Sequence, residues 1–163
     1  MGKGGGSHHY SLKNFESGEI IRAKASNLTV KFKNMVEVAS AIRKMTIARA
    51  NAYLKNVLDH KECVPFRKFK SGIGKCRQAK QFKTVNGRWP QNAAKCMIDL
   101  LKNVVANCEF YGKDPADYII GHIQVSQAAI STRRTYRAHG RINPYTRHLS
   151  HVQVVLTEKV VQK

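Results

Sequence analysis

The sequence predicts an α+β fold in which a small three-stranded antiparallel sheet packs on three helices, with a long β-ribbon projecting from the sheet. Two observations carry this prediction. Apolar residues recur at helical spacing in three segments and at every second position in three others, which are the periods of helices and strands. An arginine-rich stretch of about twenty residues separates the last two strand candidates, and a structureless loop of that length is unusual inside a compact domain.

Residues 1–24 are predicted to be an N-terminal extended arm, because they begin with a glycine-rich run and show no clear apolar period. A single domain is expected to span residues 25–163. Its first strand is predicted at Ser26–Lys33, where apolar and polar residues alternate. The apolar face of that strand consists of Leu28, Val30 and Phe32.

Three helices are expected between the first strand and the second. Asn34 is predicted to cap the first helix, with Glu37 completing a capping box, and Thr46 to cap the second. The third and longest helix should open at Trp89-Pro90 and end at Gly112. The apolar stripes are Met35, Val38, Ala39, Ile42 and Met45, then Ile47, Ala50, Leu54, Val57 and Leu58, then Ala94, Met97, Ile98, Leu101, Val104, Val105 and Cys108.

A basic insertion, residues 60–88, separates the second and third helices and lacks helical periodicity. Nine Lys or Arg residues stand there against one acid, and three phenylalanines among them are expected both to pin the insertion to the core and to contribute to binding. Its segment Gly72–Lys75 is similar to part of a phosphate loop. Phe69 stands where the first glycine of that motif belongs, and Cys76 replaces Ser or Thr, so no nucleotide site is expected.

The projecting ribbon is predicted over residues of about 126–150. Ile119, Ile123 and Val125 are expected to share one face of the strand before it, and Gly140 and Asn143-Pro144 to turn the chain near its tip. About ten residues in each direction would give a reach on the order of 30 Å. The strand after the ribbon alternates Val152, Val154 and Leu156 with Gln153, Val155 and Thr157.

The chemistry of the ribbon points to RNA. Its segment Ser131–Arg147 holds five arginines and two tyrosines, and no Asp or Glu occurs from Tyr118 to Thr157. Guanidinium groups bind phosphate and stack on bases, and tyrosine adds a flat face that can stack on unpaired bases. Like charges repel, so such a stretch becomes ordered only when it binds a polyanion. The alternative is a solvated basic loop.

Composition agrees with a polyanion partner. The chain has 163 residues, enough for one domain with a core, and 29 basic against 10 acidic residues give a net charge of +19. That imbalance opposes folding by self-repulsion unless a polyanion is bound. A membrane surface is a poorer fit, since no basic amphipathic helix stands out. Neither a secretory signal nor an apolar run of membrane-spanning length is visible, so no membrane insertion is expected.

Metal binding and catalysis are not expected. The cysteines lack the spacing of zinc sites and are predicted to be free thiols in a reducing compartment. They are Cys63, Cys76, Cys96 and Cys108. His60 could join Cys63 and Cys76 as a third ligand, but no fourth is evident, so neither a metal nor another cofactor is predicted. An RNA-acting enzyme is disfavoured because the acids are scattered singly and His139 has no acidic neighbour.

Six segments occur in an order that is typical of one protein family: SNLTVKFKN, CVPFRKFKSGIGKCRQAKQF, GRWPQNAAKCMIDLLKN, HIQV, RRTYRAHGRINPY and HVQVVLTEK. They resemble the large-subunit ribosomal proteins of universal family twenty-two, whose eukaryotic and archaeal members are called large-subunit protein seventeen. The resemblance covers roughly Ala25–Lys159, and the insertion at CVPFR is similar to the eukaryotic and archaeal branch. The start GKGGGSHH and the segment SQAAIST depart from the family pattern.

This resemblance implies a structural constituent of the large ribosomal subunit that supports cytoplasmic translation, with nucleolar assembly if the source is eukaryotic. The implied partners are large-subunit ribosomal RNA, neighbouring ribosomal proteins and the nascent polypeptide, because the family places its globular part near the exit of the peptide tunnel and its ribbon tip in the tunnel wall. The alternative hypothesis is a free-standing nucleic-acid-binding module. A ribbon without its own core suits burial in a large RNA better than docking in a DNA groove.

The candidate site residues follow from the two basic stretches and from the resemblance. The RNA-binding candidates are Arg67, Lys68, Lys70, Lys75, Arg77, Lys80, Arg88, Arg133, Arg134, Tyr136, Arg137, His139, Arg141, Tyr145 and Arg147. The candidates implied to line the tunnel are Arg134, Arg137, His139, Gly140 and Arg141.

Overall fold

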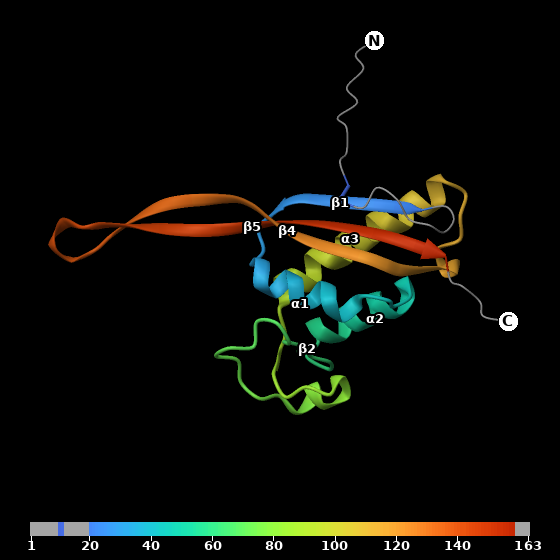
Figure 1. Cartoon of the computed structure of the whole chain (residues 1–163), viewed down its shortest axis with the longest axis horizontal. Coiled ribbons are helices and arrows are strands. Elements are labelled where there is room, and N and C mark those ends of the chain that lie inside the picture. The colour runs from blue at the N-terminus through green and yellow to red at the C-terminus, as the bar shows by residue number, and fades with distance from the viewer. Residues whose placement is uncertain (1–9, 12–19, 159–163) are drawn as a thin grey trace, which may run out of the picture.

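A three-stranded antiparallel sheet forms one layer of the protein, and helices cover one of its faces (Figure 1). The computed structural model describes residues 10–11 and 20–158. The sheet order is β1-β5-β4. The strands are β1 (Ile21–Leu28), β4 (Tyr118–Tyr136) and β5 (Ile142–Glu158), and the helices are α1 (Phe32–Ile42), α2 (Ile47–Leu58) and α3 (Gln91–Phe110). The predicted α+β class, with a small antiparallel sheet and a long projecting ribbon, is confirmed.

Smaller elements complete the chain. Two short strands, β2 (Val64–Pro65) and β3 (Gly87–Arg88), pair in a second sheet within the basic insertion. Short 3-10 helices occur in the insertion, before β4 and at the ribbon tip. These are η1 (Arg77–Phe82), η2 (Pro115–Asp117) and η3 (Ala138–Gly140).

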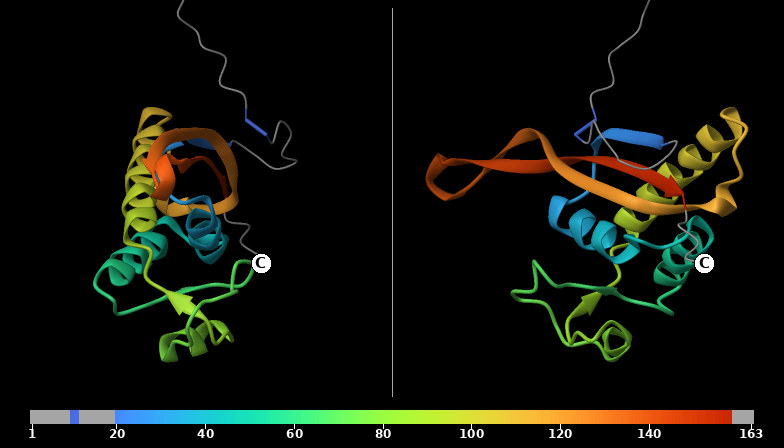
Figure 2. Two further views of the ribbon diagram at one scale, coloured as in Figure 1. Left: turned by 90° about the vertical axis from the view of Figure 1, so that its left-hand side faces the viewer. Right: turned by 45° about the vertical axis from the view of Figure 1, so that its right-hand side comes forward.

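The hydrophobic core lies between the sheet and the three helices. α3 packs under β1, α1 packs under β4, and α2 packs against α3, as the two views in Figure 2 also show. Met35 and Ile42 of α1, Leu54 of α2 and Leu101 of α3 are all completely buried. The apolar periodicity of the sequence therefore marked most of the face of each helix that meets the sheet or a neighbouring helix. In α3, however, Ile98 and Val105 of the predicted stripe are only partly buried, whereas Ala93 and Leu100 are buried.

The boundary predicted for the first strand is wrong. β1 ends at Leu28, and the next residues of the predicted strand lead into α1, which begins at Phe32. Ile21 and Ala23 are the buried residues of β1, and they lie opposite Leu156 and Val154 of β5. Tertiary pairing therefore decides the strand's position, and β1 takes in residues 21–24 of the segment predicted as an arm. Residues 1–9 and 12–19 of that segment lie outside the described part of the chain.

The predicted cap of the first helix is also wrong. α1 begins three residues earlier than expected, with Lys31 as its N-cap and no side-chain cap. Asn34 lies inside the first turn, and Glu37 is buried rather than placed at the helix start. Glu37 instead accepts hydrogen bonds from the backbone of the basic insertion.

A bulge in β4 changes the face assigned to its apolar residues. Ile120 and Ile123 are buried, whereas the alternation in the sequence grouped Ile119 with Ile123. The pairing with β5 shifts between Ile120 and His122, which adds Gly121 as an extra residue and reverses the alternation. A Cβ atom at Gly121 would collide with the side chain of Thr157, so glycine fits the close approach of β5 at this point.

The predicted ends of the other helices agree better with the structure. Thr46 caps α2, because its Oγ1 accepts a hydrogen bond of 3.3 Å from the backbone N–H of Arg49. Pro90 is the N-cap of α3, one position before the predicted first turn. Gly112 follows the C-cap of α3 with φ 67°, which is the left-handed conformation expected of a glycine just past a helix.

Replacing Thr46 with alanine should lower the free energy of unfolding by about 1 kcal/mol, because the first turn of α2 loses its only side-chain cap while the core is untouched. Urea denaturation followed by circular dichroism measures the change. Thr46→Ser, which keeps a hydroxyl acceptor, should stay close to the parent. Equal midpoints for the parent and Thr46→Ala would show that this hydrogen bond does not stabilise the helix.

Candidate nucleic-acid interface

The ribbon is the part of β4 and β5 that continues past the edge of the sheet. β1 pairs with β5 no further than Ser150, so beyond that residue β4 and β5 pair only with each other. Their pairing continues to Tyr136 opposite Ile142. None of the residues 131–148 is buried, and Figure 1 shows the ribbon extending well away from the helices. This extension has no hydrophobic core of its own.

A tight turn closes the ribbon. The N–H of Arg137 donates to the carbonyl of Arg141 over 2.8 Å, and η3 occupies the turn between them. His139 and Gly140 both adopt left-handed conformations, with φ of 60° and 66°. The predicted turn at Gly140 is therefore found. The predicted turn at Asn143-Pro144 is wrong, since both residues lie in β5, opposite Thr135 and Arg134.

Arginines occupy both faces of the ribbon. Arg133 lies opposite Tyr145, and Ser131 lies opposite Arg147, so these pairs share one face. The other face is formed by Arg134 opposite Pro144 and Tyr136 opposite Ile142. Each face thus combines a guanidinium group with an aromatic ring. The eight ribbon candidates are all exposed, and they are Arg133, Arg134, Tyr136, Arg137, His139, Arg141, Tyr145 and Arg147.

The basic insertion is held by a buried carboxylate in α1. Glu37 is 1% exposed, and its carboxylate accepts three hydrogen bonds from successive backbone N–H groups. The donors are Arg67 at 3.1 Å, Lys68 at 2.9 Å and Phe69 at 2.7 Å. Successive N–H groups that converge on an anion form a nest, so the backbone satisfies the charge of Glu37 while the side chains of Arg67 and Lys68 stay exposed.

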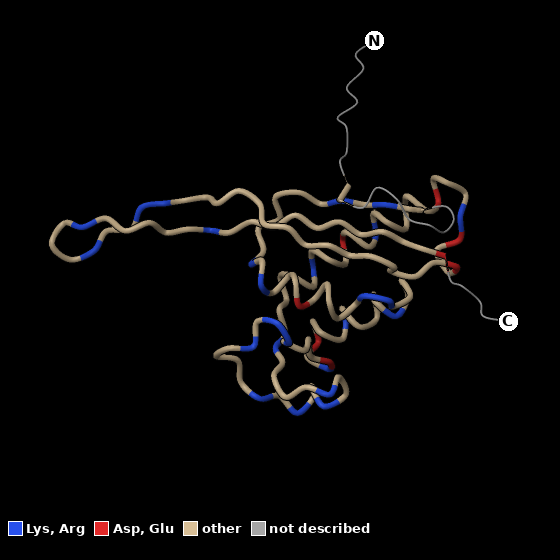
Figure 3. Tube along the Cα trace, viewed as in Figure 1, with Lys and Arg blue, Asp and Glu red and all other residues tan. Residues whose placement is uncertain are grey.

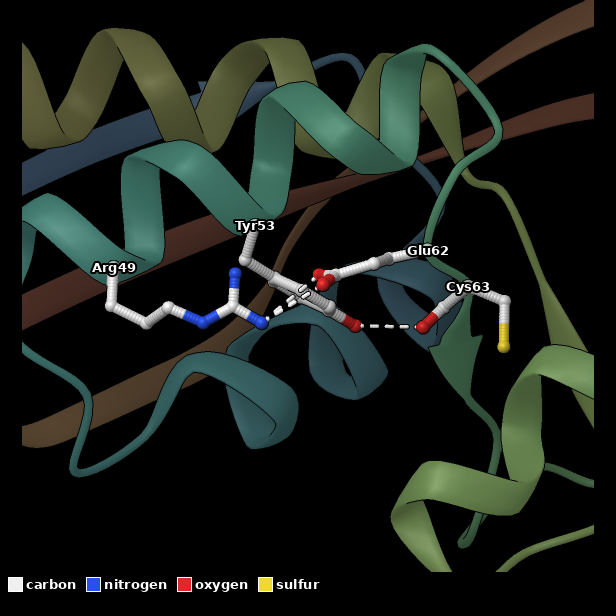
Figure 4. A network of polar contacts seen from close by, with 4 residues as sticks. All are labelled: Arg49, Tyr53, Glu62 and Cys63. Carbon is white, nitrogen blue, oxygen red and sulfur yellow. Dashed lines mark hydrogen bonds and ion pairs between the residues drawn. The ribbon is translucent and has the colours of Figure 1, made fainter.

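A second set of contacts ties the start of the insertion to α2 (Figure 4). Arg49 forms an ion pair with Glu62 at 2.9 Å, and its guanidinium lies 5.7 Å from the centre of the Tyr53 ring. The buried Tyr53 hydroxyl donates to the carbonyl of Cys63 over 2.9 Å. Burial raises the pKa of Tyr53 far above its ordinary value, so this hydroxyl keeps its proton and remains a donor.

The phenylalanines pin the insertion to the core, as the sequence predicts. Phe66 is 3% exposed. Phe82 packs edge-on against Tyr53 with ring centres 5.9 Å apart, and Phe69 does the same with Phe32 at 6.3 Å. The insertion is therefore an ordered basic lobe with a small sheet of its own, and not a loop without structure.

The candidate cations of this lobe lie at its surface. Arg67 and Arg88 donate to the carbonyls of Phe82 and Gly72, both over 3.1 Å, which fixes two guanidinium groups at the surface. All seven candidates of the insertion are exposed, and they are Arg67, Lys68, Lys70, Lys75, Arg77, Lys80 and Arg88. Figure 3 shows the lobe and the ribbon as two separate protrusions, so the two sets of candidates are not brought together.

The candidate cations have no acidic partners within residues 10–11 and 20–158. The ion pairs found there join Arg49 to Glu62, Lys61 to Asp59 and Lys102 to Asp99, none of which involves a candidate residue. In the same residues no group of three His, Cys, Asp or Glu side chains is placed to hold a metal ion. The four cysteines are free thiols, and burial raises the pKa of the Cys63 thiol to about 12.

Sequence reasoning missed the function of Glu37 and the place of two lysines. Glu37 meets the insertion across thirty residues of chain, so no local pattern indicates the contact. The alternation of apolar and polar residues predicts a strand at Lys31 and Lys33, whereas they stand at the start of α1 beside the root of the ribbon. The sequence did contain a signal that these two lysines could join the basic surface. Both belong to a run without acids that precedes an apolar helical stripe.

The fold and its two basic protrusions define a class of protein: an α+β domain whose core supports a long basic β-ribbon that has no core of its own. The described helices include none that is long and apolar enough to cross a membrane. The model of the ribosomal protein L22p/L17e family matches residues 23–157. The chain belongs to this family of structural ribosomal proteins, which is not a family of enzymes.

Relatives agree with the family match over most of their length. A protein of Biphyllus lunatus named large ribosomal subunit protein uL22 is 51% identical over 149 residues, which cover 91% of this chain and 82% of the relative. The protein of that name in Drosophila melanogaster is 50% identical over 150 residues, covering 92% and 81%. The one in Lonomia obliqua is 52% identical over 138 residues, covering 85% and 74%.

Proposed function

We propose that the chain is a structural constituent of the large subunit of the cytoplasmic ribosome. It binds ribosomal RNA with the lobe at residues 60–88 and with the ribbon, and its globular part contacts neighbouring ribosomal proteins. The ribbon tip, with Arg134, Arg137, His139, Gly140 and Arg141, forms part of the wall of the polypeptide tunnel and faces the nascent chain.

One observation carries this proposal: the ribbon is an exposed, coreless extension with five arginines and no acid. Such an element gains nothing from folding by itself, and it repels its own charges until a polyanion lies against it. RNA supplies both phosphates for the guanidinium groups and unpaired bases for Tyr136 and Tyr145. Family membership supports the ribosome as the source of that RNA.

Sedimentation of a cell lysate tests the assignment to the large subunit. We expect nearly all of the chain in the large-subunit, monosome and polysome fractions, including after a salt wash that removes loosely bound proteins. A free-standing nucleic-acid-binding module would leave the ribosomal fractions in high salt, because its few phosphate contacts are screened. Recovery of most of the chain in light fractions would contradict the proposal.

A further inference from the structure

An open groove of about 1170 Å³ lies at the root of the ribbon, where the first turns of α1 and α3 approach β4 and β5. This ribbon-root groove is lined by residues 29–34, 89–93, 127–128, 130 and 145–149. It exceeds the roughly 300–1,000 Å³ of pockets that hold drug-sized ligands, so its size does not exclude a nucleotide. The side chains that line the groove therefore decide which class of ligand it can bind.

The groove is cationic and carries an exposed aromatic ring. Lys31, Lys33 and Arg147 line it, all three are exposed, and no acid is among its lining residues. Tyr145, which is 67% exposed, presents an aromatic face. Gln91 adds an amide whose nitrogen contacts His60 Nε2 at 3.1 Å and whose oxygen can accept a hydrogen bond from a base edge. Cations beside an exposed ring and an amide fit phosphate and base together. A basic or a purely apolar partner would leave these cations uncompensated.

The groove also connects the two basic protrusions. Lys33 of the groove and Lys68 of the lobe both place their ammonium groups over the ring of Phe69, at 5.6 Å and 5.5 Å from its centre. On the other side, Tyr145 and Arg147 belong to both the groove and the ribbon. A continuous basic path therefore runs from the lobe through the groove to the ribbon.

From this charge and continuity we infer that the ribbon-root groove binds an unpaired segment of ribosomal RNA, with its phosphates on Lys31, Lys33 and Arg147 and a base stacked on Tyr145. The inference rests on the proposed RNA-binding function and adds a binding site to it, in which Lys31 and Lys33 of the globular part join the ribbon residues Tyr145 and Arg147. An unpaired strand is required because the bases of a duplex are stacked on each other and cannot lie on a side chain.

Binding of a short oligouridylate to the full-length chain tests the phosphate contacts. Lys31→Gln/Lys33→Gln should weaken binding and lower the slope of log K against log salt by about 1.4, because each phosphate contact on a single strand contributes about 0.7. The double variant Lys55→Gln/Lys102→Gln removes two exposed lysines outside the groove and should change the slope far less. Equal losses in the two double variants would overturn the inference.

Stacking is tested with a second variant. Tyr145→Ser should weaken binding of the oligouridylate about tenfold, while binding of a blunt RNA duplex, which offers no free base, should change little. An equal loss of affinity for single strand and duplex would remove the assignment of an unpaired base to Tyr145.

Photocrosslinking in assembled large subunits separates this inference from the proposed function. A diazirine side chain at Ile130 in the groove should crosslink to ribosomal RNA at unpaired nucleotides, and one at Val85 in the lobe, which is 57% exposed, should also reach RNA. RNA adducts from position 85 with only protein adducts from position 130 would overturn the groove and leave the proposed function standing. Absence of RNA adducts at both positions would contradict both.

Discussion

Glu37→Ala should destabilise the chain by about 3–5 kcal/mol and release the basic lobe. The substitution leaves three backbone N–H groups without their charged acceptor and a cavity beneath them, and each unsatisfied donor costs about 1–3 kcal/mol where water does not replace the bond. Urea denaturation measures the loss of stability. Trypsin should cleave after Arg67, Lys68 and Lys70 sooner than in the parent, because their backbone is no longer fixed.

Two further variants show whether the charge of Glu37 is the cause of that result. Glu37→Gln keeps the shape and one acceptor oxygen but turns an amide donor toward N–H donors, so its loss of stability should be intermediate. Glu109→Ala removes an exposed acid at the far end of α3 and should stay within about 0.5 kcal/mol of the parent. If Glu37→Ala had the parent's midpoint and cleavage pattern, the carboxylate would not be what holds the lobe.

The case of Glu37 also shows how far the sequence could predict this fold. Local patterns marked the helices well, since Thr46 caps α2 and Gly112 ends α3 as the residue types indicate. The same local rules misassigned Asn34 and Glu37, because the sequence pattern of a capping box is the same whether the carboxylate caps its own helix or binds a distant backbone segment. Only the tertiary structure distinguishes the two cases.

Strand positions were predicted less well for a related reason. The strand period is two, so the single extra residue at Gly121 moves Ile120 to the core face, and no local property of the sequence requires a bulge there. The site divides in the same way. The exposure of its candidate cations could be predicted from composition, because a charge without an acidic partner stays at the surface. The ribbon-root groove could not, since Lys31 and Arg147 meet there only through tertiary packing.

The tip of the ribbon allows the proposed tunnel function to be tested apart from folding and assembly. Replacing residues 134–144 by Asn-Gly would join Arg133 and Tyr145, which already lie opposite each other, through a turn that suits a hairpin. The change removes all five proposed tunnel residues and no buried side chain, so the free energy of unfolding should change little. The shortened chain should still enter the large subunit, because the lobe, the groove and the globular core are intact.

What should change is the contact with the nascent chain. A photocrosslinker placed in a stalled nascent peptide, at a position about halfway along the tunnel, should react with the parent chain and lose nearly all of that product in ribosomes that carry the shortened ribbon. Arg137→Gln/Arg141→Gln is the matched control, since it removes charge from the tip without shortening it and should keep most of the crosslink. Because the control retains the length of the ribbon, it separates reach from charge. Equal crosslink yields from parent and shortened ribosomes would show that the tip does not line the path of the nascent chain, while leaving the assignment to the large subunit intact.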